Sequence, residues 1–340
     1  MKLGFIGLGR MGGNMVLRQL EQGNEIVAWN RSPEPREELW KESKQLKKGK
    51  SNLQVVETVE ELVSSLRAPA KQSLDKNKIA ASPPAPRNDG VVIWLMVTAG
   101  DAVDQVLKQL IDKLSPNDLV VDGGNSFYKD TLRRNDMLSK KGIHYMDVGT
   151  SGGIESAREG ACLMIGGSKE DFERVLPIVK AAAWPEGFGL LGSVGAGHFA
   201  KMAHNGIEYG MMEAIGEGAA ILKYSDFKYD LREVFRVYSI KSIIDSRLIS
   251  WLHAELEKDP NLDNISSVIG SGGSHKKVKA EAHWTVDVAK EMGLDVPSVK
   301  LALKVRANSD KDKENSPKGF RNKAIAAMRW QFGHHPVKKS

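Results

Sequence analysis

One short segment with helical spacing places four polar, chemically active side chains on a single face. In the run K-M-A-H-N-G-I-E-Y-G, residues 201–210, these side chains stand at i, i+3, i+4 and i+7, and they are Lys201, His204, Asn205 and Glu208. On a helix this spacing forms one stripe about 10 Å long. Such a stripe is normally apolar, because it faces the core. A polar stripe here therefore indicates a site for a polar ligand.

The two ends of this stripe suit proton transfer. Burial and nearby cations lower the pKa of a lysine, and a neutral lysine can take a proton from a hydroxyl group. We expect Lys201 to be the base and Glu208 to supply a proton at the other end of the same substrate, with His204 and Asn205 orienting it. The alternative is a polar helix face with a pair of charges. The low helix propensity of His-Asn-Gly argues against that alternative.

A glycine-rich turn near residue 10 predicts a dinucleotide site. The run Gly7-Leu8-Gly9-Arg10-Met11-Gly12 has the pattern G-x-G-x-x-G between a predicted strand and a predicted helix. The first glycine makes the tight turn, the second lets pyrophosphate approach the backbone, and the third lets helix and strand pack closely. The phosphates would face the helix N-terminus. The alternative is a glycine-rich turn without a ligand.

The end of the second predicted strand bears on the choice of coenzyme. An NAD site usually has Asp or Glu about 20 residues after the glycines, to hold a ribose hydroxyl. Here the run is Trp29-Asn30-Arg31-Ser32, without a carboxylate. Arg31 could pair with a 2′-phosphate through its planar fork, and Asn30 and Ser32 could hydrogen-bond it. We expect NADP, with NAD as the alternative, and Arg31 could instead merely lie on the surface.

Two further glycine-containing runs follow predicted strands. They are V-D-G-G-N-S at 121–126 and S-G-G at 151–153. The carboxyl ends of parallel strands are the usual place for ligands, and glycine lets backbone N–H groups reach an anionic substrate. The alternative for each run is a loop that needs glycine only for a positive φ angle.

The first part of the chain alternates strand-like and helical patterns. Strand-like runs cover 3–7, 25–28, 91–97, 119–121 and 144–148, and helical patterns include 14–22 and 102–114. This alternation predicts a doubly wound parallel α/β sheet. Strand signals end after about Pro177, and a helical pattern runs from 197 to 224. We expect one domain at 1–180, with a mobile insertion at 67–89, and an all-α domain at 181–340, with a loop at 259–277.

Composition excludes several classes of protein. No apolar run in the 340 residues approaches the roughly 20 needed to cross a bilayer, and the start has no signal-peptide pattern. Cys162 is the single cysteine, which excludes a disulfide framework and a cysteine-rich metal site. The net charge of +6 is spread along the chain rather than gathered into a nucleic-acid patch. We expect a cytoplasmic protein that binds neither membranes nor nucleic acid.

These motifs resemble those of the decarboxylating 6-phosphogluconate dehydrogenases, in their short form. The matching runs are G-F-I-G-L-G-R-M-G, W-N-R-S, W-L-M-V-T-A-G, V-V-D-G-G-N-S, Y-M-D-V-G-T-S-G-G, K-M-A-H-N-G-I-E-Y-G and R-W-Q-F-G-H-H. The resemblance implies a Rossmann-type domain followed by helices. It also implies NADP-linked oxidation of 6-phosphogluconate at C3, loss of carbon dioxide and protonation to ribulose 5-phosphate, in the pentose phosphate pathway or gluconate utilisation.

The resemblance also implies residue roles. It makes Lys201 the base and Glu208 the acid that protonates C1. The residues implied to hold the sugar acid and its phosphate are Asn125, Ser151, Gly152, Gly153, His204, Asn205, Tyr209, Arg306, Arg329 and His335. The implied coenzyme contacts are Gly7, Leu8, Gly9, Arg10, Met11, Gly12, Asn30, Arg31, Ser32, Met96, Val97 and Asn125. In that family, the tail residues that match Arg329 and His335 enter the site from the neighbouring subunit. The resemblance therefore implies a homodimer or homotetramer. No metal is implied, because a β-keto acid decarboxylates once its ketone is polarised.

Two other functions remain as alternatives. One is another β-hydroxyacid dehydrogenase, acting on 3-hydroxyisobutyrate or reducing a short aldehyde acid. Glu208 discriminates between the two enzymes, because simple hydride transfer needs no second acid. The other alternative is a nucleotide-sensing or scaffold protein, which would bind the coenzyme without turnover.

Overall fold

The computed structural model of the chain describes residues 1–49, 52–68, 90–269 and 281–333. Its internal contacts divide the chain into two units, Met1–Lys201 and Met202–Ser340. Among the described residues, no helix combines the length and apolar character needed to span a bilayer.

The first unit is built on one eight-stranded sheet in the order β3-β2-β1-β4-β5-β6-β7-β8. The strands are β1 (Lys2–Ile6), β2 (Glu25–Trp29), β3 (Leu53–Val55), β4 (Val92–Leu95), β5 (Leu119–Asp122), β6 (His144–Ser151), β7 (Ala161–Gly166) and β8 (Ala183–Gly192). Every neighbouring pair is parallel except β6 and β7. The chain order reverses between β1 and β4, so the crevice for a ligand lies beyond their carboxyl ends. The predicted Rossmann-type sheet is confirmed.

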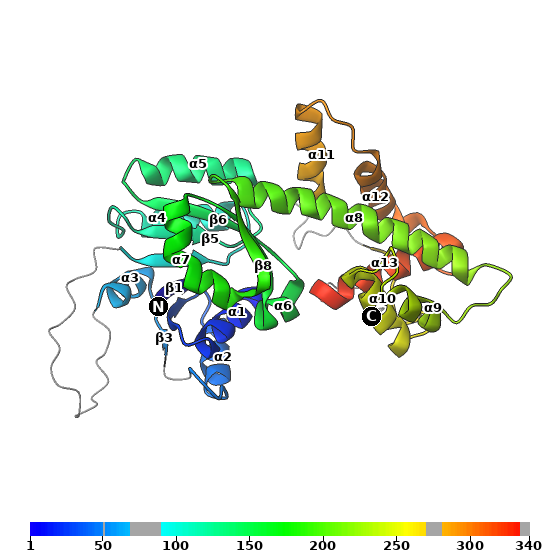
Figure 1. Ribbon diagram of the computed structural model, residues 1–340, viewed down its shortest axis with the longest axis horizontal. Helices are drawn as coiled ribbons and strands as arrows, with labels where there is room; N and C mark the ends of the chain where they lie inside the picture. Colours follow the sequence, from blue (N-terminus) through cyan, green and yellow to red (C-terminus); the bar gives the residue numbers. More distant parts are fainter. Residues whose placement is uncertain (50–51, 69–89, 270–280, 334–340) are drawn as a thin grey trace. The chain divides into compact units, whose positions relative to one another are not determined.

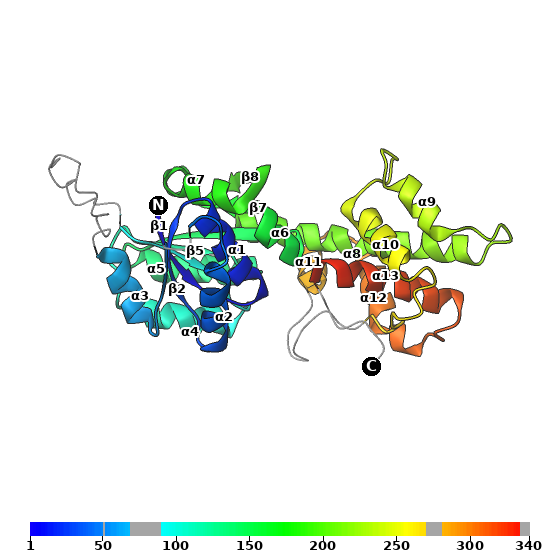
Figure 2. The same ribbon diagram turned by 90° about the horizontal axis from the view of Figure 1, so that it is seen from below.

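Helices cover both faces of this sheet (Figures 1 and 2). They are α1 (Arg10–Glu21), α2 (Glu34–Ser43), α3 (Val59–Arg67), α4 (Asp101–Leu110), α5 (Tyr128–Ser139), α6 (Gly153–Glu159) and α7 (Lys169–Ala182). The apolar side chains of α1, α2, α6 and α7 belong to one core cluster, and those of α3, α4 and α5 belong to another. The central strands are buried on both faces, which explains their continuous apolar runs.

The second unit is helical throughout its described residues. Its helices are α8 (Ala196–Lys223), α9 (Leu231–Tyr238), α10 (Arg247–Lys258), α11 (Glu281–Glu291), α12 (Pro297–Ala307) and α13 (Pro317–Gly333), with a short 3₁₀ turn at Ser309–Lys311. Helix α8 starts in the first unit and continues into the second after Lys201. One apolar cluster, which includes Met212, Phe235, Leu252 and Ile325, joins α8, α9, α10 and α13. The predicted all-α second half is confirmed for these residues.

The end of the sheet differs from the sequence prediction. We expected strand signals to stop near Pro177, and this was wrong, because β8 follows and pairs with β7. Pro177 instead lies inside α7. Strand β8 reads A-W-P-E-G-F-G-L-L-G, and its proline and glycines hide the apolar alternation of a strand. Proline is tolerated there because β8 is at the sheet edge. The contact division falls within α8, after residue 201, rather than at 180.

Two predicted irregular segments are described only in part. Residues 69–89 of the predicted insertion lie outside the described residues. The predicted loop at 259–277 holds turns without helix or strand up to residue 269, and the remainder is outside the described ranges.

Candidate active site

The glycine-rich turn has the geometry of a dinucleotide cradle. Gly7 has a φ angle of +97°, and a Cβ atom there would lie 2.4 Å from the Met96 carbonyl oxygen. A Cβ atom on Gly12 would lie 1.9 Å from the Gly7 carbonyl oxygen, so α1 and β1 require both glycines. At Gly9 a Cβ atom would meet nothing within 4 Å. The open space at the second glycine fits the approach of a pyrophosphate.

The N-terminus of α1 presents backbone donors at this space. Gly9 is the N-cap residue and makes no side-chain capping bond, and the first turn, which begins with Arg10 and Met11, has no acidic residue. Uncapped N–H groups and the positive end of the helix dipole attract anions. Together with the space at Gly9, these donors fit the phosphates of a dinucleotide.

The loop after β2 is braced by Asn30. Its Oδ1 atom accepts a hydrogen bond from the Leu8 backbone nitrogen at 2.9 Å, and its Nδ2 atom donates to the Ser32 carbonyl oxygen at 3.1 Å. These contacts tie the glycine turn to the end of β2, so Asn30 supports the turn from within. Arg31 and Ser32 are exposed beside it. The exposed guanidinium of Arg31 is available for a coenzyme phosphate.

The loops after β4 and β5 are in direct contact. A Cβ atom on Gly124 would lie 2.9 Å from the Val97 carbonyl oxygen. Met96, Val97 and Asn125 are all half-buried in these two loops. The predicted coenzyme contacts after β4 therefore lie beside the loop that carries Asn125.

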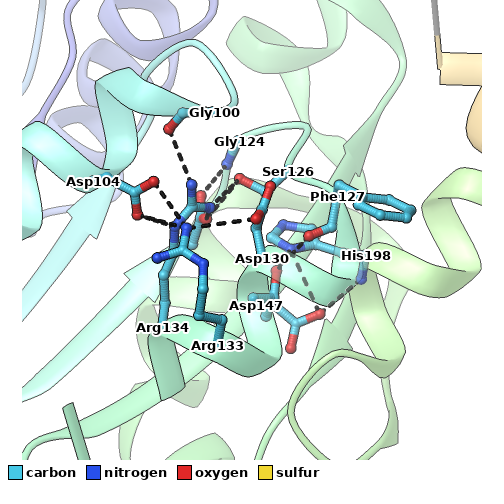
Figure 3. A network of polar contacts seen from close by, with 12 residues as sticks. Gly100, Asp104, Gly124, Ser126, Phe127, Asp130, Arg133, Arg134, Asp147 and His198 are labelled. Carbon is cyan, nitrogen blue, oxygen red and sulfur yellow. Dashed lines mark hydrogen bonds and ion pairs between the residues drawn. The ribbon is translucent and has the colours of Figure 1, made fainter. Parts of the chain in front are cut away.

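The buried carboxylate of Asp122 shapes the loop after β5, which carries the Gly124 and Ser126 labelled in Figure 3. Asp122 Oδ1 accepts a hydrogen bond from the Gly124 backbone nitrogen at 3.1 Å. Its Oδ2 atom accepts from Ser126 Oγ at 2.8 Å and from Tyr145 Oη at 3.1 Å. Burial and the adjacent Asp122 carboxylate raise the pKa of Tyr145 well above its usual value, so the phenol remains a donor. These bonds fix the backbone on both sides of Asn125.

The Ser151-Gly152-Gly153 run joins β6 to α6. Gly152 has a φ angle of +122° and Gly153 a φ angle of +75°, so the backbone itself requires glycine at both positions. The preceding Thr150 donates through Oγ1 to the Gly123 carbonyl oxygen at 3.2 Å. This bond links the S-G-G turn to the loop that carries Asn125, as both substrate-binding predictions require.

The first turn of α8 is anchored to β6 by Asp147. One carboxylate oxygen accepts from the Gly195 backbone nitrogen at 2.6 Å, and the other accepts from the His198 backbone nitrogen at 2.7 Å. The buried His198 ring in turn lies 2.7 Å from Thr131 Oγ1 on α5, through Nδ1. Burial raises the pKa of Asp147, and His198 and the two amide donors oppose that rise. A carboxylate thus satisfies two N–H groups at a helix start.

This anchor fixes the position of Lys201 at the end of the first unit. A Cβ atom on Gly149 would lie 2.4 Å from Lys201 Cβ, and one on Gly197 would lie 2.4 Å from the Met164 carbonyl oxygen. The start of α8 therefore packs on β6 and β7 at two side-chain-free positions. Lys201 is 8% exposed. Its burial on α8 matches the sequence prediction.

The polar stripe continues on α8 in the second unit. His204 Nδ1 lies 3.2 Å from Asn205 Oδ1 and 3.8 Å from Glu208 Oε2. Asn205 is buried, whereas His204 and Glu208 are half-exposed. A Cβ atom on Gly206 would lie 2.7 Å from Thr285 Cγ2 of α11. Close packing of α11 therefore explains the glycine within this helix, and the stripe keeps its predicted spacing.

Two buried arginines interact with Tyr209 in the second unit, Arg306 by direct contact and Arg329 electrostatically. The Arg306 guanidinium lies 3.5 Å from the centroid of the Tyr209 ring. Burial lowers the pKa of Arg306 to about 10, and the charge of Arg329 adds to that effect. Burial also lowers the pKa of Arg329, against the attraction of Tyr209, Glu281 and Glu208. Within the described part of the chain, neither guanidinium lies within ion-pair distance of a carboxylate. Both remain cationic at neutral pH, and such a pair suits a bound anion.

Arg329 lies inside its own chain. It is 4% exposed and donates to the Ile269 carbonyl oxygen. The implied donation of Arg329 to a neighbouring subunit stays a prediction. His335, the other predicted tail residue, lies outside the described residues.

Sequence reasoning missed two buried charged groups, Asp147 and Arg134. Asp147 interrupts the buried strand β6, and a charge within a strand-like run is rare unless it is paired, so this residue could have been found. Arg134 shares its buried helix face with Thr131 and Leu138, and α5 is otherwise polar, so no apolar pattern marked it.

Comparison with known families agrees with this geometry. Residues 2–192 match the NAD-binding domain of 6-phosphogluconate dehydrogenase, and residues 197–338 match the C-terminal domain of 6-phosphogluconate dehydrogenase. The two matches meet at the start of α8. NAD(P) binding by the first unit is therefore supported by both the fold and the family.

Individual relatives can be aligned with nearly the whole chain. YqeC of Bacillus subtilis (strain 168), a provisional 6-phosphogluconate dehydrogenase, is 36% identical over 100% of both chains. The NAD⁺-dependent decarboxylating 6-phosphogluconate dehydrogenase of Haloferax volcanii is 33% identical over 99% of this chain and 98% of its own. The solved Plasmodium falciparum 6-phosphogluconate dehydrogenase, described with NADP⁺ and with 6-phosphogluconate, has a TM-score of 0.74 at 30% identity, over 93% of this chain and 66% of its own. The chain belongs to the 6-phosphogluconate dehydrogenase family.

Proposed function

We propose that the chain catalyses the oxidative decarboxylation of 6-phosphogluconate to ribulose 5-phosphate with NADP as oxidant. The observation that carries this proposal is the buried pair Arg306 and Arg329 beside Tyr209. Two cations without a carboxylate partner among the described residues suit a dianionic phosphate. Short 3-hydroxy acids have no phosphate that would use this pair. The P. falciparum relative, described with 6-phosphogluconate, supports the same substrate.

The coenzyme preference rests on the end of β2. The residues directly after Trp29 are Asn30, Arg31 and Ser32, with no carboxylate among them to hold a ribose 2′-hydroxyl, and Arg31 and Ser32 are exposed there. A guanidinium fork and a hydroxyl suit the 2′-phosphate of NADP. The H. volcanii relative is NAD⁺-dependent, so family membership alone leaves this preference open. We assign the preference to Arg31.

The sugar acid would be held by polar groups from loops and helix α8. Asn125 and the S-G-G turn at 151–153 offer an amide, a hydroxyl and backbone N–H groups beside the switch point of the sheet. His204 and Asn205 offer hydrogen bonds from α8. Preorganised donors of this kind hold an anionic substrate and stabilise charge that develops on its oxygens.

We assign the proton transfers of the reaction to Lys201 and Glu208, which stand at the two ends of the polar stripe. Neutral Lys201 would take the proton of the C3 hydroxyl, and NADP held at the glycine-rich turn would supply the hydride acceptor. The resulting 3-keto acid loses its C1 carboxyl group as carbon dioxide, while the Lys201 ammonium donates a proton to the ketone oxygen. Glu208 then protonates C1 of the enediol, which was C2 of the substrate, and neutral Lys201 takes the proton of the adjacent hydroxyl as the C2 carbonyl of the product forms. Each step uses general acid–base catalysis by a side chain of α8.

Substrate specificity tests the proposal. Purified protein is assayed by nicotinamide absorbance with 6-phosphogluconate, gluconate and 3-hydroxyisobutyrate, each with NADP and with NAD. We expect turnover of 6-phosphogluconate and at least about a hundredfold lower kcat/KM for gluconate, because the buried arginines lose their anion. Preference for 3-hydroxyisobutyrate would refute the proposal in favour of a short-chain β-hydroxyacid dehydrogenase. Coenzyme binding without turnover of any of the three would indicate a nucleotide-sensing protein.

A further inference from the structure

Arg134 on α5 is the most completely buried arginine of the first unit's polar network (Figure 3), and it serves no predicted binding contact. Its side chain is 0% exposed. A buried guanidinium is costly unless its donors are satisfied. Arg134 directs its three nitrogens to three different partners, so the cost is offset by specific bonds.

Those partners belong to two different loops. Nη2 donates to the Gly100 carbonyl oxygen at 3.0 Å, in the loop after β4. Nη1 donates to Ser126 Oγ at 3.3 Å, in the loop after β5, and lies 3.7 Å from Asp122 Oδ2. Nε donates to Asp104 Oδ1 at 2.9 Å, in the first turn of α4. One rigid planar group therefore spans the start of α4 and the start of α5.

The bridged loops are those that carry predicted ligand contacts. Met96 and Val97 precede Gly100 in one loop, and Asn125 precedes Ser126 in the other. The loops also touch, because a Cβ atom on Gly124 would lie 2.9 Å from the Val97 carbonyl oxygen. Movement of either loop would therefore change the distance between the coenzyme and sugar-acid contacts.

We propose that Arg134 is a positioning residue that holds these two loops in register, so that coenzyme and sugar acid meet in the correct geometry. This inference rests on the proposed function in taking Met96, Val97 and Asn125 as ligand contacts. Hydride transfer needs the donor carbon and the acceptor ring within near-attack distance, and a displacement of about 1 Å can cost about a hundredfold in rate. Arg134 touches neither ligand and acts through the loops.

The neighbouring arginine provides a matched control. Arg133 also bonds Asp104, with its Nη2 atom 3.0 Å from Oδ1 and 2.9 Å from Oδ2, but its side chain is 54% exposed. Figure 3 shows both arginines converging on Asp104, while only Arg134 reaches Gly100 and Ser126. The same substitution at the two positions separates loss of the loop bridge from loss of an Asp104 contact.

The test uses R134K and R133K in the full chain. Lysine keeps the charge, but its single ammonium group cannot reach three separated partners. Amide hydrogen exchange is measured on peptides that cover 96–101 and 122–127, together with the Kd of NADPH by fluorescence and the kinetic constants. For R134K we expect faster exchange in both loops together, an NADPH Kd raised about tenfold and a kcat lowered about tenfold or more. For R133K we expect all values within about twofold of wild type.

The outcomes separate a positioning role from a merely structural one. Unchanged exchange and NADPH affinity in R134K would overturn the proposal, and so would faster exchange throughout the first unit, which indicates general destabilisation. If R134K does not fold, D104A removes the carboxylate that Nε contacts, R133K controls for the Arg133 contact with the same carboxylate, and the same two results decide. Exchange and NADPH binding need no turnover. Failure of wild type to oxidise 6-phosphogluconate would therefore refute the proposed function without deciding the role of Arg134.

Discussion

At the scale of single residues, Lys201 carries the chemistry that we propose. Replacement of Lys201 by Met keeps the length of the side chain and removes the base. We expect kcat to fall by about 10²–10⁴, the usual contribution of a general base, while NADPH still binds. Lys223→Met, at the exposed far end of the same helix, is the matched control, with unchanged kinetics expected. Near-normal turnover by the Lys201 variant would show that the base lies elsewhere.

At the same scale, Arg31 carries the coenzyme preference that we propose. Its guanidinium is exposed after β2, where a 2′-phosphate would lie. We expect Arg31→Ala to weaken NADPH binding about 10- to 100-fold through loss of a charge-assisted bidentate contact, and to change NADH binding less than about twofold. Fluorescence titration with the two reduced coenzymes measures this difference. Equal losses for both would contradict the assignment of Arg31 to the phosphate.

At the scale of elements, the packing of α8 on the sheet fixes where Lys201 lies relative to strand β6. A methyl group on Gly149 would lie 2.4 Å from Lys201 Cβ, so β6 and α8 must separate to accommodate it. We expect Gly149→Ala to lower kcat about 10- to 100-fold and to leave coenzyme affinity nearly unchanged. Gly218→Ala on the same helix is the control, because its Cβ atom would meet nothing within 4 Å. It should leave kinetics unchanged and stabilise α8 by about 0.5–1 kcal/mol. Steady-state kinetics and thermal unfolding measure both variants, and normal kcat in Gly149→Ala would contradict the docking role.

Helix α8 also carries a destabilising buried acid in the second unit. Burial raises the pKa of Glu213 to about 7, although Arg321 Nε lies 3.5 Å away. Because this folded-state pKa lies above the ordinary glutamate pKa of 4.5, the contribution of Glu213 to stability falls as pH rises from about 4.5 to about 7. We expect Glu213→Gln to be more stable than wild type at pH 8, by at most about 3 kcal/mol, with little gain below pH 5.

Urea unfolding at pH 5 and pH 8 measures this difference. Glu217→Gln, an exposed neutralisation on the next turn, is the control and should shift stability by less than about 0.5 kcal/mol. Equal effects of Glu213→Gln at both pH values would contradict a raised pKa for Glu213, because the folded and unfolded states would then bind protons equally.

The sequence predicted the elements best where local pattern and tertiary environment agree. The runs that became β1, β2, β4 and β5 are mainly apolar because both of their faces are buried, and α8 follows its helical spacing closely. Strands β3, β7 and β8 were not predicted. β3 is short, and β8 contains proline and glycines, so their pairing is decided by the neighbouring strand rather than by local pattern.

The site residues also divide into those marked by a local sequence pattern and those that act through tertiary contacts. Motifs located the glycine turn, the polar stripe and the loops after β5 and β6, because each consists of residues adjacent in sequence. Asp147 and Arg134 act through contacts with distant residues, at His198 and at Gly100, which no local spacing reveals. The bracing role of Asn30 was missed for the same reason, since its partner Leu8 lies on another element.

At the scale of the whole molecule, the second unit exposes many large apolar side chains. Those between the start of α8 and the start of α10 are Ile207, Met211, Ile221, Tyr224, Phe227, Tyr229, Val237, Ile240, Ile243 and Ile244. Such a surface is typical of an interface between copies of one chain. We therefore propose that the protein is a homo-oligomer.

Light scattering after size exclusion tests this assembly. Wild type should be at least a dimer at micromolar concentration, and the double variant Phe227→Asp, Ile243→Asp should shift toward monomer without loss of helical circular dichroism. A wild-type monomer would contradict the proposal. Unchanged assembly in the double variant would place the interface on another surface.

The reaction itself distinguishes decarboxylating oxidation from simple hydride transfer. The most direct measurement is the ratio of carbon dioxide released to NADPH formed when the purified protein acts on 6-phosphogluconate. We predict one carbon dioxide per NADPH, with ribulose 5-phosphate as the product, because oxidation at C3 creates a β-keto acid and Glu208 can protonate the enediol. NADPH formation without carbon dioxide, or turnover confined to short 3-hydroxy acids, would contradict the account.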